Sequence, residues 1–212
     1  MVKKRELDYF IKMQKKHIDL VDRRLLQKQT IPHEEKLFSI FENHAEWLYK
    51  GKATKPITIG HNVLIATDQF NFVLHHEVLI RKADSQSTKQ LGDILTSKYP
   101  GQIKVLSLDK GFYSKENKEY IKTQIPYPVM PKKGKCTQEE YTEEHEDQFI
   151  KHRNKHSAVE SNINQLRHNN LSHCPDKGIR NFKRYVAMGV LTYNIHKLGE
   201  HLQARLKLKK AV

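Results

Sequence analysis

The sequence predicts a mixed α/β fold, because helix-like and strand-like stretches alternate along the chain. Helical stretches occupy residues 1–29 and 179–206. Apolar and polar residues alternate, as in strands, within residues 57–66 and 72–80. A further strand-like run, residues 103–109, ends in an acidic residue. The order of these segments is therefore that of a mixed α/β plan.

The first stretch carries apolar residues such as Leu7, Ile18 and Leu25 with charged residues between them, which is helical periodicity. Proline stops or kinks a helix, so Thr30-Ile31-Pro32 is expected to end it. The apolar run Lys36–Phe41 then predicts a short strand that closes on Glu42.

Residues 57–66 and 72–80 predict a β-hairpin, with a turn at Thr67-Asp68-Gln69. His75 and His76 are adjacent on the second strand and therefore point to opposite faces of it. They cannot form a pair of metal ligands on one face, and we interpret them as structural.

The middle of the chain predicts a helix at 86–98, the strand at 103–109, and a helix that begins near Ser114, a favourable N-cap residue. Residues 126–147 are first proline-rich, then basic, then acidic, which predicts a mobile loop. Helix is expected again at 146–169.

The order strand, hairpin, crossover helix, fourth strand matches a ribonuclease-H-like mixed sheet with an N-terminal helix and C-terminal helices. We expect an N-terminal helical segment at 1–30, the ribonuclease-H-like core at 31–170, and a C-terminal helical extension at 171–212.

Charge points to a polyanionic partner. The 212 residues include 38 Lys and Arg against 24 Asp and Glu, a formal net charge of +14. Such a surplus binds nucleic acid by releasing counterions from its phosphates. The alternative is a basic surface that serves solubility, or ribosome-type basicity without catalysis.

Membrane and extracellular classes are disfavoured. No apolar run approaches the roughly 18 residues that span a bilayer, and the first residues lack an apolar signal core, so we expect a cytoplasmic protein. Cys136 and Cys174 belong to no CxxC pair, and we interpret both as reduced thiols.

Two acids carry the candidate chemistry. Asp109 ends an apolar strand where Gly111 lets the backbone turn, and Glu160 lies on a helix beside the apolar positions Val159, Ile163 and Leu166. Convergent carboxylates hold the two metal ions, about 4 Å apart, that assist displacement at phosphate. The plainer interpretations are that Asp109 caps a strand and that Glu160 is a surface residue.

Several segments in a fixed order carry a resemblance to a known family. They are Ile31-Pro32-His33-Glu34-Glu35-Lys36, Phe38-Ser39-Ile40-Phe41-Glu42, Lys50-Gly51-Lys52-Ala53, the hairpin at Gly60, Asp109-Lys110-Gly111-Phe112, His156-Ser157-Ala158-Val159-Glu160-Ser161 and Gly178 through Tyr185. Together they resemble bacterial insertion-sequence transposases of the DDE type, most closely the ISNCY-like group. The resemblance covers nearly the whole chain.

The resemblance implies that Asp109 and Glu160, which lie 51 residues apart, are the second and third catalytic acids and bind Mg²⁺ or Mn²⁺. For the first acid, Glu42 is the best positional candidate, Glu46 the second and Asp19 a poor third. Candidate DNA-binding residues are Lys132, Lys133, Lys135, Arg153, Lys155, His156 and Arg167.

The implied activity is cleavage and joining of double-stranded DNA at transposon ends and target, in the bacterial cytoplasm near the nucleoid and without a membrane; a homodimer stays open. His156 and Arg167 stand where the family pattern often has Arg and Lys. Longer relatives begin with a helix-turn-helix region that this sequence lacks, so the alternative is a truncated, inactive remnant that only binds DNA. A stand-alone nuclease of the same fold is a third hypothesis.

Overall fold

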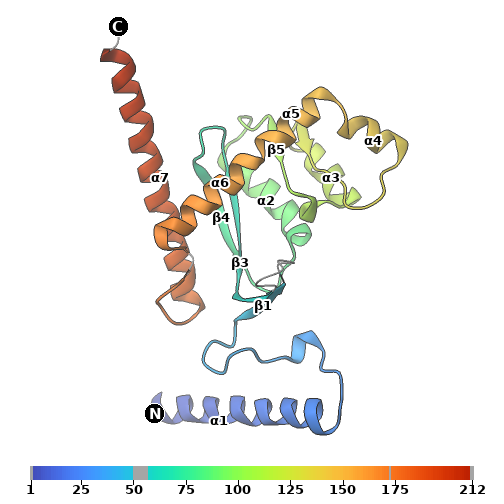
Figure 1. Cartoon of the computed structure of the whole chain (residues 1–212), viewed down its shortest axis with the longest axis vertical. Coiled ribbons are helices and arrows are strands. Elements are labelled where there is room, and N and C mark those ends of the chain that lie inside the picture. Colours follow the sequence, from blue (N-terminus) through green and yellow to red (C-terminus); the bar gives the residue numbers. More distant parts are fainter. Residues whose placement is uncertain (1, 50–56, 172, 211–212) are drawn as a thin grey trace. The chain divides into compact units, whose positions relative to one another are not determined.

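A computed structural model describes residues 2–49, 57–171 and 173–210 (Figure 1). The chain forms two compact units: unit 1 comprises Met1–Asn62 with Asp176–Phe182, and unit 2 comprises Val63–Pro175 with Lys183–Val212. We describe each unit by itself. The segment Lys50-Gly51-Lys52-Ala53 lies outside the described residues.

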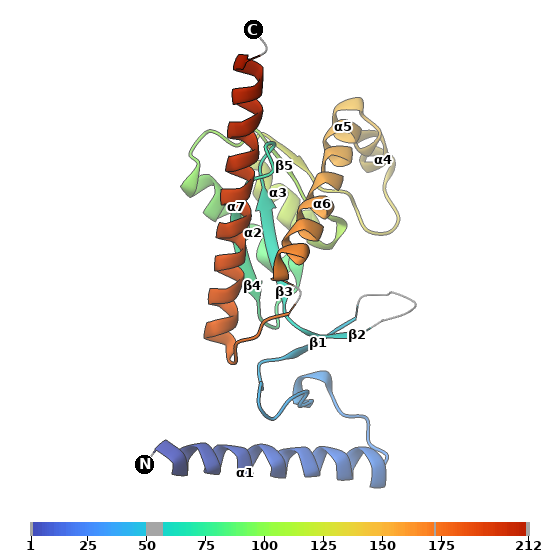
Figure 2. The ribbon, with the colours of Figure 1, turned by 60° about the vertical axis from the view of Figure 1, so that its left-hand side comes forward.

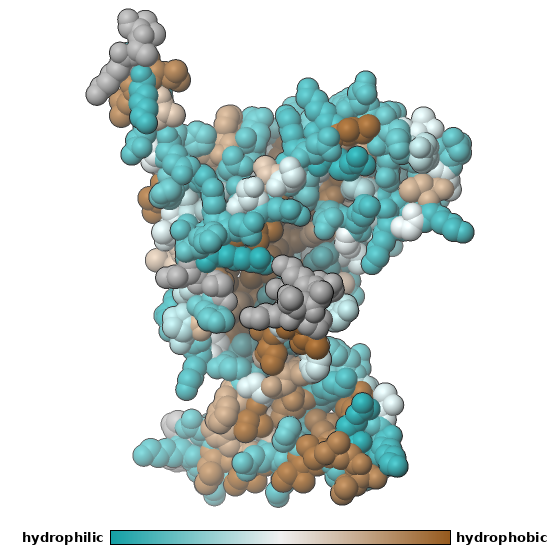
Figure 3. Space-filling view, in the orientation of Figure 1, coloured by the Kyte–Doolittle hydropathy of each residue, from teal (hydrophilic) through white to brown (hydrophobic). Residues whose placement is uncertain are grey.

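Unit 1 begins with α1 (Val2–Val21), which continues into one π-helical turn, Asp22–Leu26. The predicted N-terminal helix is therefore confirmed, although it ends before Thr30. Apolar side chains on α1 face solvent, with Leu7 60% and Ile18 66% exposed, and Figure 3 shows hydrophobic patches in this part of the chain.

Strand β1 (Glu46–Tyr49) pairs antiparallel with β2 (Ile57–Gly60), and the register places Glu46 opposite Gly60. The predicted strand at 36–41 is wrong. Ser39 Oγ accepts the backbone N–H groups of Phe41 and Glu42, at 3.2 and 2.9 Å, so the chain turns back on itself instead of extending.

In unit 2, β3 (Asn62–Thr67) and β4 (Val73–Leu79) form the predicted hairpin. Asp68 Oδ1 accepts the N–H groups of Phe70 and Phe72, both at 2.9 Å, and so fixes the turn.

A crossover follows the hairpin. The predicted helix is α2 (Asp84–Lys98), and the predicted strand is shorter than expected, β5 (Val105–Ser107). Ser114 caps α3 (Lys115–Lys122) by accepting the N–H of Asn117 at 3.0 Å, as expected. The helix returns the chain to β6 (Tyr127–Val129), which pairs parallel with β5.

The prediction of a loop over 126–147 is wrong, because this range holds β6 and α4 (Gln138–Glu144). Pro128 is tolerated in β6 because the ladder uses the N–H of Tyr127 and the carbonyl of Val129, so the missing N–H falls on the unpaired edge. Thr137 and Glu140 form a capping box that starts α4.

The predicted helix at 146–169 is present but broken at His156 into α5 (Asp147–Lys155) and α6 (Ser157–Leu166). A π-helical turn, Arg167–Leu171, follows α6. The last helix, α7 (Ile179–Lys210), is confirmed and is 32 residues long (Figure 2).

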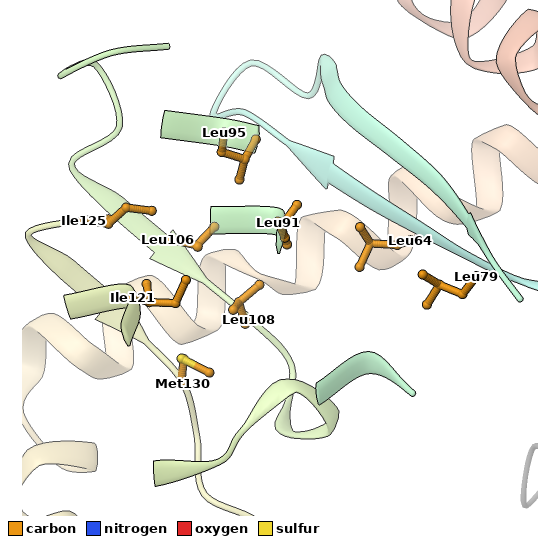
Figure 4. Close-up of a cluster of buried hydrophobic side chains, with 9 residues drawn as sticks. All are labelled: Leu64, Leu79, Leu91, Leu95, Leu106, Leu108, Ile121, Ile125 and Met130. Carbon is orange, nitrogen blue, oxygen red and sulfur yellow. The ribbon is translucent and has the colours of Figure 1, made fainter. Parts of the chain in front are cut away.

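The hairpin of unit 2 lies between two apolar layers, because successive strand residues point to opposite faces. On one face, Leu64 packs in a cluster with residues of α2, β5 and α3 (Figure 4), and Leu74 packs against this cluster. Val73 on the other face packs with Leu166 of α6 and Tyr193 of α7.

Asn194 of α7 also binds the backbone of Val73 with both side-chain atoms, at 2.9 and 3.0 Å. The mixed α/β class is thus confirmed, while hydrogen bonds link the strands of the described chain only in pairs.

Candidate acidic site and basic surface

Asp109 lies just beyond β5, where the chain leaves the core. Leu108 is still buried and donates its N–H to the carbonyl of Val129 at 2.9 Å, whereas Asp109 is exposed. Its Oδ1 accepts the N–H of Lys110 at 2.7 Å and caps the 3₁₀ turn Lys110–Phe112. Asp109 therefore caps the turn that follows β5, and one of its carboxylate oxygens takes part in that hydrogen bond.

Asp84, in the first turn of α2, lies beside this turn. A Cβ atom on Gly111 would stand 3.0 Å from Asp84 Oδ2, so the glycine permits the close approach. The pKa of Asp84 is raised, first by burial and then by the negative charge of Asp109. Asp84 therefore lies beside the turn that Asp109 caps, close enough for the two charges to interact.

Sequence reasoning missed Asp84. A signal was present, because a helix that crosses over to a strand begins at the end of the sheet where that strand finishes. An acid in the first turn of the helix at 84–98 is therefore a natural neighbour of an acid that follows the strand at 105–107.

Glu160 lies on α6 and is exposed, whereas Asn162 and Leu166 are the buried residues of that helix. The apolar stripe was predicted correctly at Leu166, which is 5% exposed. The sequence leads us to expect the Asp109 and Glu160 carboxylates within roughly 4 to 9 Å of each other, the range that one or two bridging metal ions can span. None of the contacts described for this part of the chain joins Glu160 to Asp109, so this expectation stays a prediction.

Glu42 belongs to unit 1 and lies in the turned segment rather than at a strand end. Both of its oxygens accept the N–H of Gly178, at 3.1 and 3.0 Å, and Oε2 also lies 2.7 Å from His44 Nε2. Glu46 Oε1 contacts His61, and Asp19 pairs with Arg23 at 3.5 Å. Each of these candidates for the first acid already has a protein partner.

Within the described ranges, no three His, Cys, Asp or Glu side chains converge on a point that could hold a metal ion. The pair Asp84 and Asp109 nevertheless offers the hard oxygen ligands that Mg²⁺ prefers, and Mg²⁺ commonly completes its shell with water. The donor chemistry of the acidic pair therefore fits this ion.

Most candidate DNA-binding side chains are solvent-facing: Lys133, Lys135, Arg153, Lys155 and Arg167 are exposed, and His156 is half-buried. Lys132 differs from these residues. Its Nζ lies 2.6 Å from Glu140 Oε2, and this contact is the largest of the causes that lower the pKa of Glu140 to about 2. Lys132 is therefore partly neutralised within the fold.

Comparison with protein-family models, with curated proteins and with solved structures finds no match for this chain. Among the described helices, none combines the length and apolar character needed to cross a membrane.

Proposed function

We propose that this chain is the catalytic-core portion of a DDE transposase, which uses a divalent metal to cut and join DNA strands. The observation that carries the proposal is the placement of Asp84 beside the 3₁₀ turn that Asp109 caps, where the charge of Asp109 acts on Asp84, in a basic chain of net charge +14. Paired carboxylates beside a polyanion-binding surface suit phosphodiester chemistry.

The arrangement of unit 2 supports a ribonuclease-H-like core. A hairpin leads to a crossover helix and then to β5. The helix α3 connects β5 to β6, and these two strands pair in parallel. Helices cover both faces of the hairpin, through Leu91 of α2 on one side and Tyr193 of α7 on the other. The proposed sheet joins β3 to β5, which would align the two strand pairs into one layer.

In the proposed site, Asp84 takes the place of the first acid in preference to Glu42. The carboxylate of Glu42 already accepts hydrogen bonds from Gly178 and lies against His44, whereas Asp84 lies beside the turn that Asp109 caps. Bound Mg²⁺ would stabilise the charge that develops on the attacking and leaving oxygens. Glu160 would approach from α6 as the third acid.

One observation favours a second candidate, a remnant that binds DNA without cutting it. Glu160 is exposed and the described contacts bring it to neither acid, so the acidic site has two members rather than three. A stand-alone nuclease would share the same acids and differ only in leaving DNA strands unjoined.

The test is nicking and end-joining of supercoiled plasmid by the full chain with Mg²⁺ or Mn²⁺. Asp109→Asn and Asp84→Asn should each abolish nicking without weakening DNA binding, because each removes a charge and keeps the shape. Glu160→Gln should do the same, and Glu42→Gln should not. The control is Asp147→Asn, an exposed acid of α5.

Joined products identify a transposase, and cleavage without joining identifies a nuclease. If the wild-type chain binds DNA but never nicks it with either metal, the hypothesis of an inactive DNA-binding remnant is correct. Nicking by the Asp109→Asn variant would show that the acidic site does not carry out the cleavage.

A further inference from the structure

We infer that α1 is a dimerisation helix, which pairs in parallel with α1 of a second copy of this chain as a two-stranded coiled coil. The inference is independent of the proposed function, since α1 contains none of Asp84, Asp109 and Glu160. It starts from an apolar stripe of α1 that is exposed to solvent.

The stripe has the heptad spacing of a coiled coil. Its members are alternately four and three residues apart: Leu7, Ile11, Gln14, Ile18 and Val21. Such spacing places all of them along one line of the helix surface. The four apolar members are between 41% and 66% exposed, and Gln14 is exposed as well. In heptad terms the two isoleucines occupy a positions, and isoleucine at a favours two-stranded coiled coils.

The helix has little packing of its own. Among the side chains described for α1, only Leu20 is buried, and Phe10 contacts Phe41 at a ring distance of 5.7 Å. Neither Leu20 nor Phe10 belongs to the stripe. A helix in a protein draws most of its stability from packing of its apolar face rather than from propensity. A second helix along the stripe would supply the packing that α1 lacks.

Charge identifies the second helix as another copy of α1. In a parallel coiled coil, each g residue faces the e residue of the next heptad on the other helix. Lys3 at g then faces Asp8 of the second copy and forms an ion pair with it. His17 at g faces Asp22 and can donate a hydrogen bond to its carboxylate. Twofold symmetry repeats each of these pairs, so the surface of α1 is complementary to itself.

The orientation follows from the same residues. In the antiparallel register that sets Ile11 against Val21, Asp8 would face Asp22 of the second copy, and the like charges would repel. In a parallel pair Gln14 meets its own copy, and two amides can exchange hydrogen bonds because each has a donor and an acceptor. In an antiparallel pair Gln14 would face an isoleucine instead. Both observations favour the parallel orientation.

The first test is sedimentation equilibrium of the full chain, without DNA or metal. We expect a reversible dimer, and Ile18→Lys should weaken it by at least about a hundredfold, because two lysine side chains would enter the apolar seam. The matched control is Ile195→Lys on α7, since Ile195 is 61% exposed and Ile18 is 66% exposed. This control should leave the dimer unchanged. A chain that stays monomeric at the highest attainable concentration would overturn the inference. So would a dimer that Ile195→Lys disrupts and Ile18→Lys does not.

The second test exchanges the charges of one proposed pair. Lys3→Asp and Asp8→Lys should each weaken the dimer by at least about threefold, because like charges then face each other. The double variant should return to within about twofold of the wild type, because it restores the pair with its charges exchanged. Both side chains are exposed, so these variants test the interface without disturbing the core. A double variant weaker than either single variant would contradict the pairing.

The third test fixes the orientation by disulfide cross-linking. It uses the full chain with Cys136 and Cys174 replaced by Ser, so that the introduced cysteine is the only one. Gln14→Cys should form a covalent dimer on mild oxidation, because a parallel pair places residue 14 beside its own copy. Lys12→Cys lies on the outer face of the helix and should stay uncross-linked. Equal cross-linking of the two variants would overturn the parallel coiled coil. None of the three assays depends on nicking, so their outcome is separate from that of the proposed function.

Discussion

The negative charge of Asp109 raises the pKa of Asp84, although the two residues lie 25 positions apart on different elements. Burial contributes more to this shift than Asp109 does, so Asp84 is both partly desolvated and beside a like charge. Both effects oppose ionisation of Asp84, while its place in the first turn of α2 favours it. The raised pKa means that the opposing effects win.

Asp84→Asn should therefore stabilise the protein near neutral pH. A raised pKa in the folded state means that the native protein holds this proton more tightly than the unfolded chain does. Stability is lost as pH rises from below the ordinary value of 3.8 through the raised value. We expect a melting temperature about 2–4 °C above wild type at pH 7, or roughly 1 kcal/mol, and no gain below pH 3.

Thermal unfolding at both pH values, with and without Mg²⁺, measures this effect. Added Mg²⁺ should stabilise the wild type and not the variant, because a cation that binds only the folded state shifts the equilibrium. A gain that is the same at both pH values would show that charge is not its cause.

Tyr193→Phe should destabilise unit 2. The Tyr193 hydroxyl, on a side chain that is 1% exposed, lies 2.9 Å from Asn162 Oδ1 and 3.0 Å from the carbonyl of Asn71. Removing it takes a donor from the buried Asn162 Oδ1, at a cost of about 1–3 kcal/mol. Urea denaturation measures the loss, and Tyr141→Phe, at an exposed tyrosine of α4, should change stability little.

Two glycines in helices should respond oppositely to alanine. A Cβ on Gly92 of α2 would stand 2.5 Å from Cδ1 of the buried Ile121, so Gly92→Ala should destabilise by about 1–3 kcal/mol. Around Gly199 of α7 nothing described lies within 4 Å of such an atom. Gly199→Ala should therefore stabilise by about 1 kcal/mol, from helix propensity alone. Equal effects in chemical denaturation would mean that α2 and α3 are packed less closely than described.

DNA binding should fall steeply with salt. If about six phosphates are neutralised, the slope of log affinity against log salt should be near −5, with little preference between two unrelated duplexes. Fluorescence anisotropy measures both quantities. Substituting exposed Lys133 or Lys135 by Ala should reduce the slope by about 1 each. Lys132→Ala should reduce it less, because Lys132 is already paired with Glu140. A flat salt response would show that the basic surface does not bind DNA.

The sequence predicted correctly those turns and helix ends that are fixed by hydrogen bonds between residues close together in the chain. The hairpin turn at Asp68 and the cap at Ser114 both follow from side chains that bond to their own backbone neighbourhood. The apolar run at 36–41 misled because its rings pack against other rings, as Phe38 does on Trp47 at 5.6 Å, rather than in a sheet. The strand Tyr127–Val129 was not predicted, because Pro128 disfavours a strand. Only the parallel register shows that the backbone nitrogen of Pro128 faces away from β5.

Of Asp84 and Asp109, only Asp109 could be predicted from the sequence. Asp109 stood out because an apolar strand ended on it, a pattern contained within a few residues. Asp84 became visible only when the crossover brought α2 next to the end of β5. The same holds for His44 and His61, whose contact depends on the pairing of β1 with β2. The sequence contains these residues, but the pairing of strands that brings them together cannot be inferred from it.

The bond between Asn194 and the backbone of Val73 spans 121 positions, which bears on how the chain folds as it is made. A nascent chain that has emerged only through α6 already holds the whole hairpin, yet Val73 has no partner for its edge groups. Until α7 follows, that edge can pair with a strand of another molecule. Chains that stop before residue 194 should therefore aggregate during synthesis, even though every strand of unit 2 is complete.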